Sequence, residues 1–231
     1  MAVIARSRPT LITRPRNCVG LAARMLWDWS PMSVTPGRST RCSPNSATGG
    51  RRTQRARQRG RPSTVGSFED LTDDQWRQAF DDGVMGMVHC VRSALPLLRT
   101  AAWARIVNFS AHSTQRQSVV LPAYTAAKAA LTSISKNLSL LLAKDEILVN
   151  VVSPGSIASE SLVGWAKSVG VDGDDPYQLM DAIAKHFGHP AHLPRAGLPD
   201  EIGPVVAFLA SRRNSYMTGA NVNVDGGSDF T

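Results

Sequence analysis

The chain has 231 residues, 42% of them hydrophobic, which is enough for one large domain with a sizeable core or for two small ones. The net charge of +8 is unevenly placed, since residues 1–63 hold 13 Arg and one Asp (+12) and residues 64–231 carry −4. No run approaches the ~18 apolar residues of a membrane span, and Cys18, Cys42 and Cys90 support neither a disulfide framework nor a zinc site. We therefore expect a reducing, cytoplasmic compartment, no membrane and no metal.

The first 63 residues show no sustained period of 2 or 3.6 and are rich in Arg, Pro, Ser and Thr. We predict a poorly ordered basic segment that is separate from a folded domain over residues 64–231. Its densest part, Gly50–Arg61, is typical of a tail that binds nucleic acid, although a merely solvated arm is the more ordinary interpretation. An organelle transit peptide is a further alternative.

A regular pattern begins after residue 64. Thr72–Gln75 forms a capping box, in which a hydroxyl and an amide side chain satisfy backbone amides at the start of a helix. The apolar residues that follow predict one long helix from Asp73 to Leu98 with a single buried face, formed by Trp76, Phe80, Val84, Met87, Val88, Val91, Leu95 and Leu98.

Short apolar strands then alternate with helices. We predict strands at 104–110, 147–152 and 220–225 and helices at 122–143 and 199–211. This alternation indicates a parallel sheet that is covered by helices on both faces. Residues 156–198 are less regular and follow a strand end, where open α/β sheets bind ligands, so we expect a substrate lid there.

Tyr124 and Lys128 lie four residues apart on the predicted helix 122–143, and their side chains leave the same face one turn apart. A nearby ammonium favours the phenolate, so we expect it to lower a tyrosine pKa that is ordinarily about 10. Such a pair is a candidate proton donor and acceptor. Alone the pattern is weak, because an exposed lysine beside a partly buried tyrosine is its ordinary interpretation.

Several motifs occur together in one order along residues 64–231, and with them the chain resembles the short-chain dehydrogenase/reductase family. The resemblance implies a Rossmann-like fold and hydride transfer between NAD or NADP and an alcohol, ketone or aldehyde. The motifs that carry it are Ile106–Ser110, Tyr124-x-x-x-Lys128, Val149–Gly155, Arg195–Ile202, Phe208–Ser211, Tyr216–Gly219 and Val224–Gly227.

The resemblance also implies roles for individual residues. The tyrosine at Tyr124 exchanges a proton with the substrate oxygen, and Lys128 binds the nicotinamide ribose and lowers the tyrosine pKa. The turn that holds the nicotinamide carboxamide and a nearby phosphate matches Pro154, Gly155, Ile157 and Ser159.

Two side chains of the family pattern are replaced in this chain. The serine expected thirteen residues before the tyrosine is Ala111, which offers no hydrogen-bond donor to an oxyanion. Ser110 and Ser113 are the possible substitutes, and we favour Ser113 narrowly because strand alternation points Ser110 to the other face. The asparagine expected seven residues after the tryptophan is Gly83.

The largest departure is the absence from residues 1–63 of the T-G-x-x-x-G-x-G motif, which holds the pyrophosphate at a helix N-terminus. We therefore expect the N-terminal strands to be truncated or replaced by the irregular basic segment. We hypothesise that this segment is an out-of-frame or wrongly started translation. We identify no residue in the sequence that would select NAD over NADP.

The leading interpretation is an oxidoreductase for a small-molecule alcohol or carbonyl compound. The alternatives are a catalytically impaired family member that acts through subunit association, and a nucleic-acid-associated protein that uses the basic tail. We expect a dimer or tetramer that packs through the helices 73–98 and 122–143. The candidates for substrate contact are His112, His186, His189 and His192, although loop histidines are more often solvated.

Overall fold

The computed structural model describes residues 2–6 and 64–228, which belong to one compact unit. The predictions for the basic segment 7–63 fall outside these residues. The elements are β1 (Ala2–Arg6), α2 (Asp73–Phe80), a π-helical turn (Asp81–Met85), α3 (Gly86–Arg99), β2 (Ala104–Phe109), a 3₁₀ turn (His112–Thr114), α4 (Pro122–Leu142), a second 3₁₀ turn (Ala143–Asp145), β3 (Ile147–Pro154), α5 (Glu160–Ser168), α6 (Pro176–Phe187), α7 (Pro199–Leu209) and β4 (Asn221–Val224).

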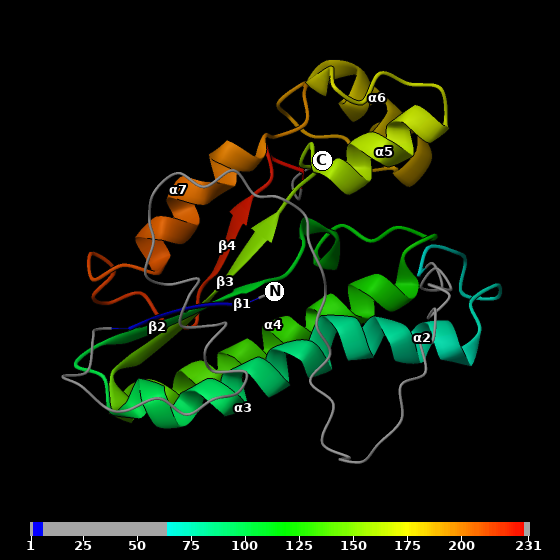
Figure 1. The fold of residues 1–231 in the computed structure, drawn as a ribbon. Helices are drawn as coiled ribbons and strands as arrows, with labels where there is room; N and C mark the ends of the chain where they lie inside the picture. The colour runs from blue at the N-terminus through cyan, green and yellow to red at the C-terminus, as the bar shows by residue number, and fades with distance from the viewer. Residues whose placement is uncertain (1, 7–63, 229–231) are drawn as a thin grey trace, which may run out of the picture. The chain divides into compact units, whose positions relative to one another are not determined.

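The strands form one sheet in the order β1-β2-β3-β4 (Figure 1). β2, β3 and β4 are parallel, with Ile106 opposite Val149 and Val152 opposite Val222. Helices cover both faces of this sheet, so the predicted Rossmann-like α/β fold is confirmed.

The sequence analysis assigned no strand to the first residues, and the structure adds one there. β1 pairs antiparallel with β2, with Ile4 opposite Ile106 and Ala2 opposite Asn108. Without β1, the backbone amides and carbonyls along one side of β2 would form an open edge. A short apolar segment from the start of the chain therefore covers the edge of the parallel sheet.

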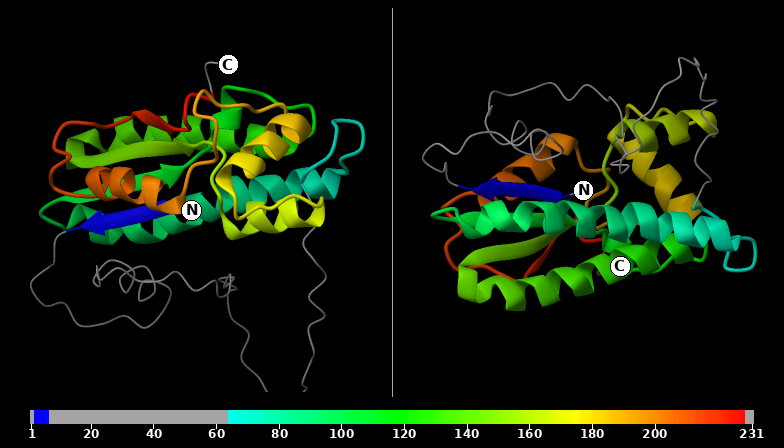
Figure 2. Two further views of the ribbon diagram at one scale, coloured as in Figure 1. Left: turned by 90° about the horizontal axis from the view of Figure 1, so that it is seen from above. Right: turned by 60° about the horizontal axis from the view of Figure 1, so that its bottom comes forward.

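Alternate residues of the central strands enter two separate cores. On one face Ile106 and Val149 pack with α3 and α4, and on the other Val107 and Val152 pack with α7. The two helix layers are visible on either side of the sheet in Figures 1 and 2. This period of two explains why the strand segments read as continuous apolar runs.

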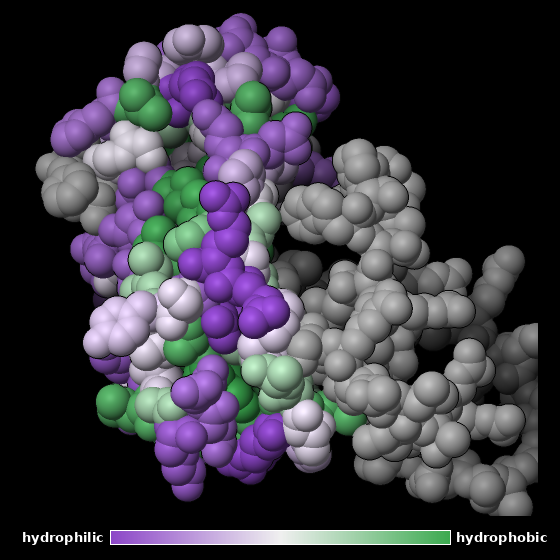
Figure 3. Space-filling view, turned by 90° about the vertical axis from the view of Figure 1, so that its left-hand side faces the viewer, coloured by the Kyte–Doolittle hydropathy of each residue, from purple (hydrophilic) through white to green (hydrophobic). Residues whose placement is uncertain are grey.

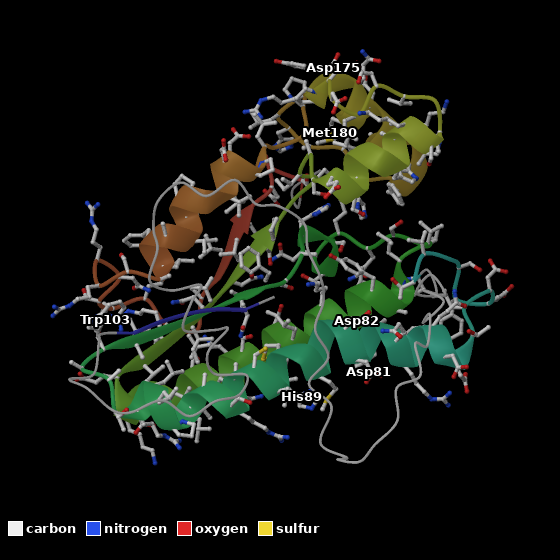
Figure 4. The ribbon with its side chains drawn as sticks, viewed as in Figure 1. Asp81, Asp82, His89, Trp103, Asp175 and Met180 are labelled. Atoms are coloured by element: carbon white, nitrogen blue, oxygen red, sulfur yellow. The ribbon has the colours of Figure 1, made fainter. Side chains whose placement is uncertain are left out.

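The predicted helix 73–98 begins as expected, because the Thr72 amide donates to Gln75 Oε1 at 2.9 Å in a complete capping box. The helix is interrupted, however, by the π-helical turn that starts at Asp81 and Asp82, both labelled in Figure 4. The wider turn changes the phase of the apolar stripe. Phe80, expected on the buried face, is 37% exposed.

Residues 156–198 form the two helices α5 and α6, which Figure 1 shows beyond the carboxyl ends of β3 and β4. They share a small core of their own, which includes Ala166, Leu179 and Ile183. This segment stands where the sequence analysis placed a substrate lid.

The surface in Figure 3 has hydrophobic residues interspersed with hydrophilic ones. Among the described residues, no helix is long and apolar enough to cross a membrane. The same part of the chain contains no cluster of three or more His, Cys, Asp or Glu side chains suited to a metal ion.

Candidate active site

Helix α4 positions Tyr124 and Lys128 beside the carboxyl end of β2. Pro122 opens the helix, and the two side chains follow one turn apart. Lys128 Nζ donates a hydrogen bond to the Phe109 carbonyl oxygen at 2.9 Å and lies 5.8 Å from the centroid of the Tyr124 ring. The predicted phenol and ammonium are therefore brought together at a strand end, where α/β proteins bind ligands.

The expected direction of the tyrosine pKa shift is wrong for this structure. Burial raises the pKa of the Tyr124 phenol, and burial lowers the pKa of the Lys128 ammonium. Desolvation disfavours the charged form of each group, and the ammonium is hydrogen-bonded to a backbone carbonyl instead of the phenol. The phenol consequently carries its proton at neutral pH.

The two candidate serines differ in their contacts. Ser110 is buried, and its hydroxyl donates to the Lys128 carbonyl oxygen at 3.2 Å and accepts from Thr132 Oγ1 at 2.7 Å. These bonds hold β2 against α4. The sequence analysis missed Thr132, although its position one turn after Lys128 on the same helix face was a usable signal.

Ser113 lies in the 3₁₀ turn after β2 and is 2% exposed. Its Oγ has no hydrogen-bond partner among the described residues. Buried hydroxyls in folded proteins almost always have a partner, so an unpaired one needs an explanation, such as a ligand. Of the two serines, Ser113 is thus the one whose hydroxyl has no hydrogen-bond partner among the described residues.

The turn after β3 is built on a close approach of two strand ends. The Gly155 amide donates to the Val224 carbonyl oxygen at 3.0 Å, and a Cβ on Gly155 would lie 2.5 Å from Cα of Asp225. No side chain fits there. Pro154, one residue earlier, accepts a hydrogen bond on its carbonyl oxygen from Nδ1 of His112 at 3.2 Å.

The remaining residues of this turn lead into α5. Ile157 forms a parallel bridge with Gly197 and packs against the core on the α7 face. Ser159 is exposed and is the N-cap of α5, where its Oγ accepts from the Leu162 amide at 3.4 Å. A helix N-terminus favours negative charge, which suits the phosphate expected here.

The four candidate histidines divide into two pairs. His112 and His189 are 6% and 3% exposed, so the expectation of solvated loop histidines is wrong for both. Their rings form an edge-to-face contact with centroids 4.9 Å apart. His186 and His192 are exposed, and the His186 ring contacts Trp165 at 5.4 Å.

Gly83 lies in the π-helical turn and faces α4. A Cβ on Gly83 would lie 3.1 Å from the Cβ of Ala127, the residue before Lys128. This spacing is tighter than an ordinary van der Waals contact, so the side chain that the family pattern expects at this position has little room.

We expect Gly83→Asn to lower the free energy of unfolding by about 1–3 kcal/mol, because the added side chain overpacks the contact with α4. Gly86→Asn is the matched control, since a Cβ there meets only the Asp81 carbonyl oxygen at 3.7 Å. Urea unfolding of the two variants and the parent measures the difference. Equal midpoints for both variants would contradict this account of Gly83.

Comparisons with known proteins identify the family of this chain. Residues 59–229 match the family model described as Enoyl-(Acyl carrier protein) reductase. The chain is 33% identical over 157 residues to oxidoreductase asL5 of Sarocladium schorii, covering 68% of this chain and 58% of that protein. It is 32% identical over 165 residues to the meso-2,3-butanediol dehydrogenase of Serratia marcescens, covering 71% of this chain and 59% of that protein.

Among solved structures, the chain is similar to L-sorbose reductase from Gluconobacter frateurii complexed with NADPH and L-sorbose. The TM-score is 0.65 at 26% sequence identity, and the match covers 81% of this chain and 65% of that one. The chain spans 50–61% of the length of the curated relatives that it matches. The family match extends over most of the chain, and we conclude that the chain belongs to the short-chain dehydrogenase/reductase family.

Proposed function

We propose that this chain is an NAD(P)-dependent oxidoreductase that reduces a ketone or aldehyde, with Tyr124 as the proton donor. The observation that carries this proposal is the placement of Tyr124 and Lys128 on α4 beside the ends of β2 and β3, with burial holding the phenol in its protonated form. A protonated phenol can donate to a carbonyl oxygen as the carbon receives hydride.

The residues on the nicotinamide side suit the cofactor, which supplies the hydride when bound. Lys128 offers an ammonium and α5 an N-terminus for a phosphate. The residues that would hold the pyrophosphate are not found, because no T-G-x-x-x-G-x-G motif occurs in the sequence. We therefore assign Lys128, Pro154, Gly155, Ile157 and Ser159 to the nicotinamide half alone.

In this mechanism Tyr124 donates its phenolic proton to the substrate oxygen, and Ser113 donates a hydrogen bond to the same oxygen. Lys128 places a positive charge near the phenolate that forms, which stabilises it. The residues of this chain thus supply the proton to the substrate oxygen and stabilise the negative charge that develops on that oxygen and on the phenolate.

The substrate class that we propose is a small α-hydroxy ketone or the corresponding vicinal diol. The names of two relatives support it, because meso-2,3-butanediol carries hydroxyls on adjacent carbons and L-sorbose carries hydroxyls beside its ketone. The free, exposed thiol of Cys90 suits a reducing compartment, which we propose to be the cytoplasm.

The experiment that tests the function is a titration of the purified chain with NADH and with NADPH, followed by turnover assays. The carbonyl substrates are 3-hydroxybutan-2-one, L-sorbose and cyclohexanone, of which the last lacks an adjacent hydroxyl. We expect binding of one dinucleotide and consumption of it with the hydroxy ketones. No binding of either dinucleotide at millimolar concentration overturns the proposal.

Ser113→Ala is expected to lower kcat on the order of 100-fold, because it removes the hydroxyl donor to the developing oxyanion. Ser110→Ala is the matched control, since the Ser110 hydroxyl forms hydrogen bonds between β2 and α4. We expect that variant to lower the free energy of unfolding by about 1 kcal/mol and to keep kcat within about tenfold. The reverse ranking of the two variants in kcat would assign the role to Ser110.

The second candidate function is a non-catalytic family member that acts through subunit association. Ala111 and Gly83 favour it, and so do Leu140 and Leu141 at the end of α4, which are 70% and 54% exposed. Analytical ultracentrifugation of the parent and of Leu140→Ser/Leu141→Ser tests the association. A dimer or tetramer that dissociates in the variant, without dinucleotide binding by either protein, supports this candidate over the enzyme.

A further inference from the structure

We propose that the buried pair His112–His189 positions the serine-bearing 3₁₀ turn and makes the site acid-sensitive. The inference rests on the proposed function, because it concerns the turn that carries Ser113. His112 is the neighbour of Ser113 in this turn, and His189 follows α6 in the segment beyond the strand ends. The two rings meet edge to face at 4.9 Å with an interplanar angle of 77°.

His112 joins the turn to the end of β3. Its Nδ1 lies 3.2 Å from the carbonyl oxygen of Pro154. Because a carbonyl oxygen can only accept, Nδ1 carries the hydrogen. One side chain therefore ties the position of Ser113 to the position of the turn at Gly155.

His189 joins the same turn to the end of α6. Gly188 ends the helix in the left-handed conformation, at φ +69°, and its carbonyl oxygen accepts a hydrogen bond from Nε of Arg116 at 3.1 Å. The backbone of Arg116 and Gln117 hydrogen-bonds with His189. The segment that follows Ser113 is thus fastened to the end of α6 both by the ring contact and by these bonds.

The surroundings of His189 favour its neutral ring. Burial is the main cause that lowers the pKa of His189, and the positive charges of His112 and Arg116 lower it further. In the part of the chain that the structure describes, these two side chains are the charged groups that act on His189, and neither is a carboxylate. A proton on the buried ring of His189 lies beside these two positive charges, so protonation weakens the contact that holds the turn.

The sign of the pH effect follows from the lowered pKa. The folded state binds fewer protons at His189 than the unfolded state, whose pKa is near the ordinary 6.5. Stability is therefore full above about pH 6.5 and falls as the pH drops below it. The turnover of the parent enzyme is expected to decline over the same range.

Three variants test separately the titrating group of His189, the ring of His112 and the hydrogen-bond donor of His112. His189→Phe keeps an aromatic ring and removes the titrating group. His112→Asn keeps a donor near the Nδ1 position and removes the ring, whereas His112→Phe keeps the ring and removes the donor. His186→Gln is the control, because His186 is exposed on α6 and lies outside the pair.

The first measurement is the pH dependence of kcat and of urea unfolding between about pH 5 and 8. We expect His189→Phe to lose most of the acid decline in both, and His186→Gln to retain it. At pH 7.5 we expect both His112 variants to lower kcat about fivefold, the effect of one hydrogen bond of about 1 kcal/mol, with KM within twofold. An acid decline of unchanged size in His189→Phe overturns the inference.

The second measurement is hydrogen exchange of the amides 111–117, which needs neither dinucleotide nor substrate. We expect exchange at least fivefold faster in His112→Asn and His112→Phe than in the parent and in His186→Gln. Equal exchange in all four proteins overturns the inference, even for an active enzyme. Absence of dinucleotide binding by the parent overturns the proposed function, whereas the exchange and unfolding results still decide the role of the pair.

Discussion

Replacing Tyr124 by Phe is expected to lower kcat by about 100-fold or more and to leave the dinucleotide dissociation constant within about twofold. The substitution removes one oxygen from a partly buried ring and keeps the packing of that ring on α4. A proton donor acts mainly in the transition state, so the loss is expected in kcat and not in binding. Single-turnover oxidation of the bound reduced dinucleotide measures the step directly.

Tyr177→Phe is the matched control for this substitution. Tyr177 is 56% exposed in the first turn of α6, and removing its hydroxyl is expected to change neither turnover nor stability. A Tyr124→Phe enzyme with activity within tenfold of the parent would assign the proton to another group. A water molecule would then be the alternative proton donor.

Most of the sheet and its helices could be predicted from local pattern. The period of 3.6 located α4 to within one residue, and the capping box at Thr72 located the start of α2. The strand β2 was predicted one residue too long, and β3 two residues too short. These elements bury a continuous stripe or run of side chains, so their signal lies in adjacent residues.

What the sequence could not predict depends on contacts between distant residues. β1 is a five-residue apolar segment, and its partner β2 lies about a hundred residues away. The π-helical turn includes Gly83, which packs closely against Ala127 of α4. Neither contact leaves a periodic pattern in its own segment, so pattern analysis extended one helix through the turn and assigned no strand at the start.

In the site, too, the sequence predicted which residues lie together, whereas their properties depend on their surroundings in the fold. Sequence comparison selected Tyr124 and Lys128 correctly as neighbours, but burial and the Phe109 carbonyl set the directions of their pKa shifts. For the two serines, alternation along the strand favoured Ser113, and the hydrogen bonds of Ser110 to α4 supply the physical reason. Which hydroxyl is available depends on the packing partner and not on the spacing.

Replacing Gly155 by Ala is expected to lower the free energy of unfolding by about 3 kcal/mol, at the upper end of the usual range for overpacking. The new Cβ would lie 2.5 Å from Cα and 2.8 Å from the carbonyl oxygen of Asp225, and no side-chain rotation relieves a clash with backbone. The ends of β3 and β4 must then separate, which also strains the hydrogen bond from the Gly155 amide to Val224.

For a chain of this size the loss corresponds to a Tm about 6–12 °C lower, which calorimetry can measure. Gly164→Ala in α5 is the control, because no atom lies within 4 Å of a Cβ at that position, and a helical alanine is expected to raise stability by up to about 1 kcal/mol. Equal Tm values for the two variants would show that the strand ends can separate without cost. In that case the approach of Asp225 would not explain the glycine at position 155.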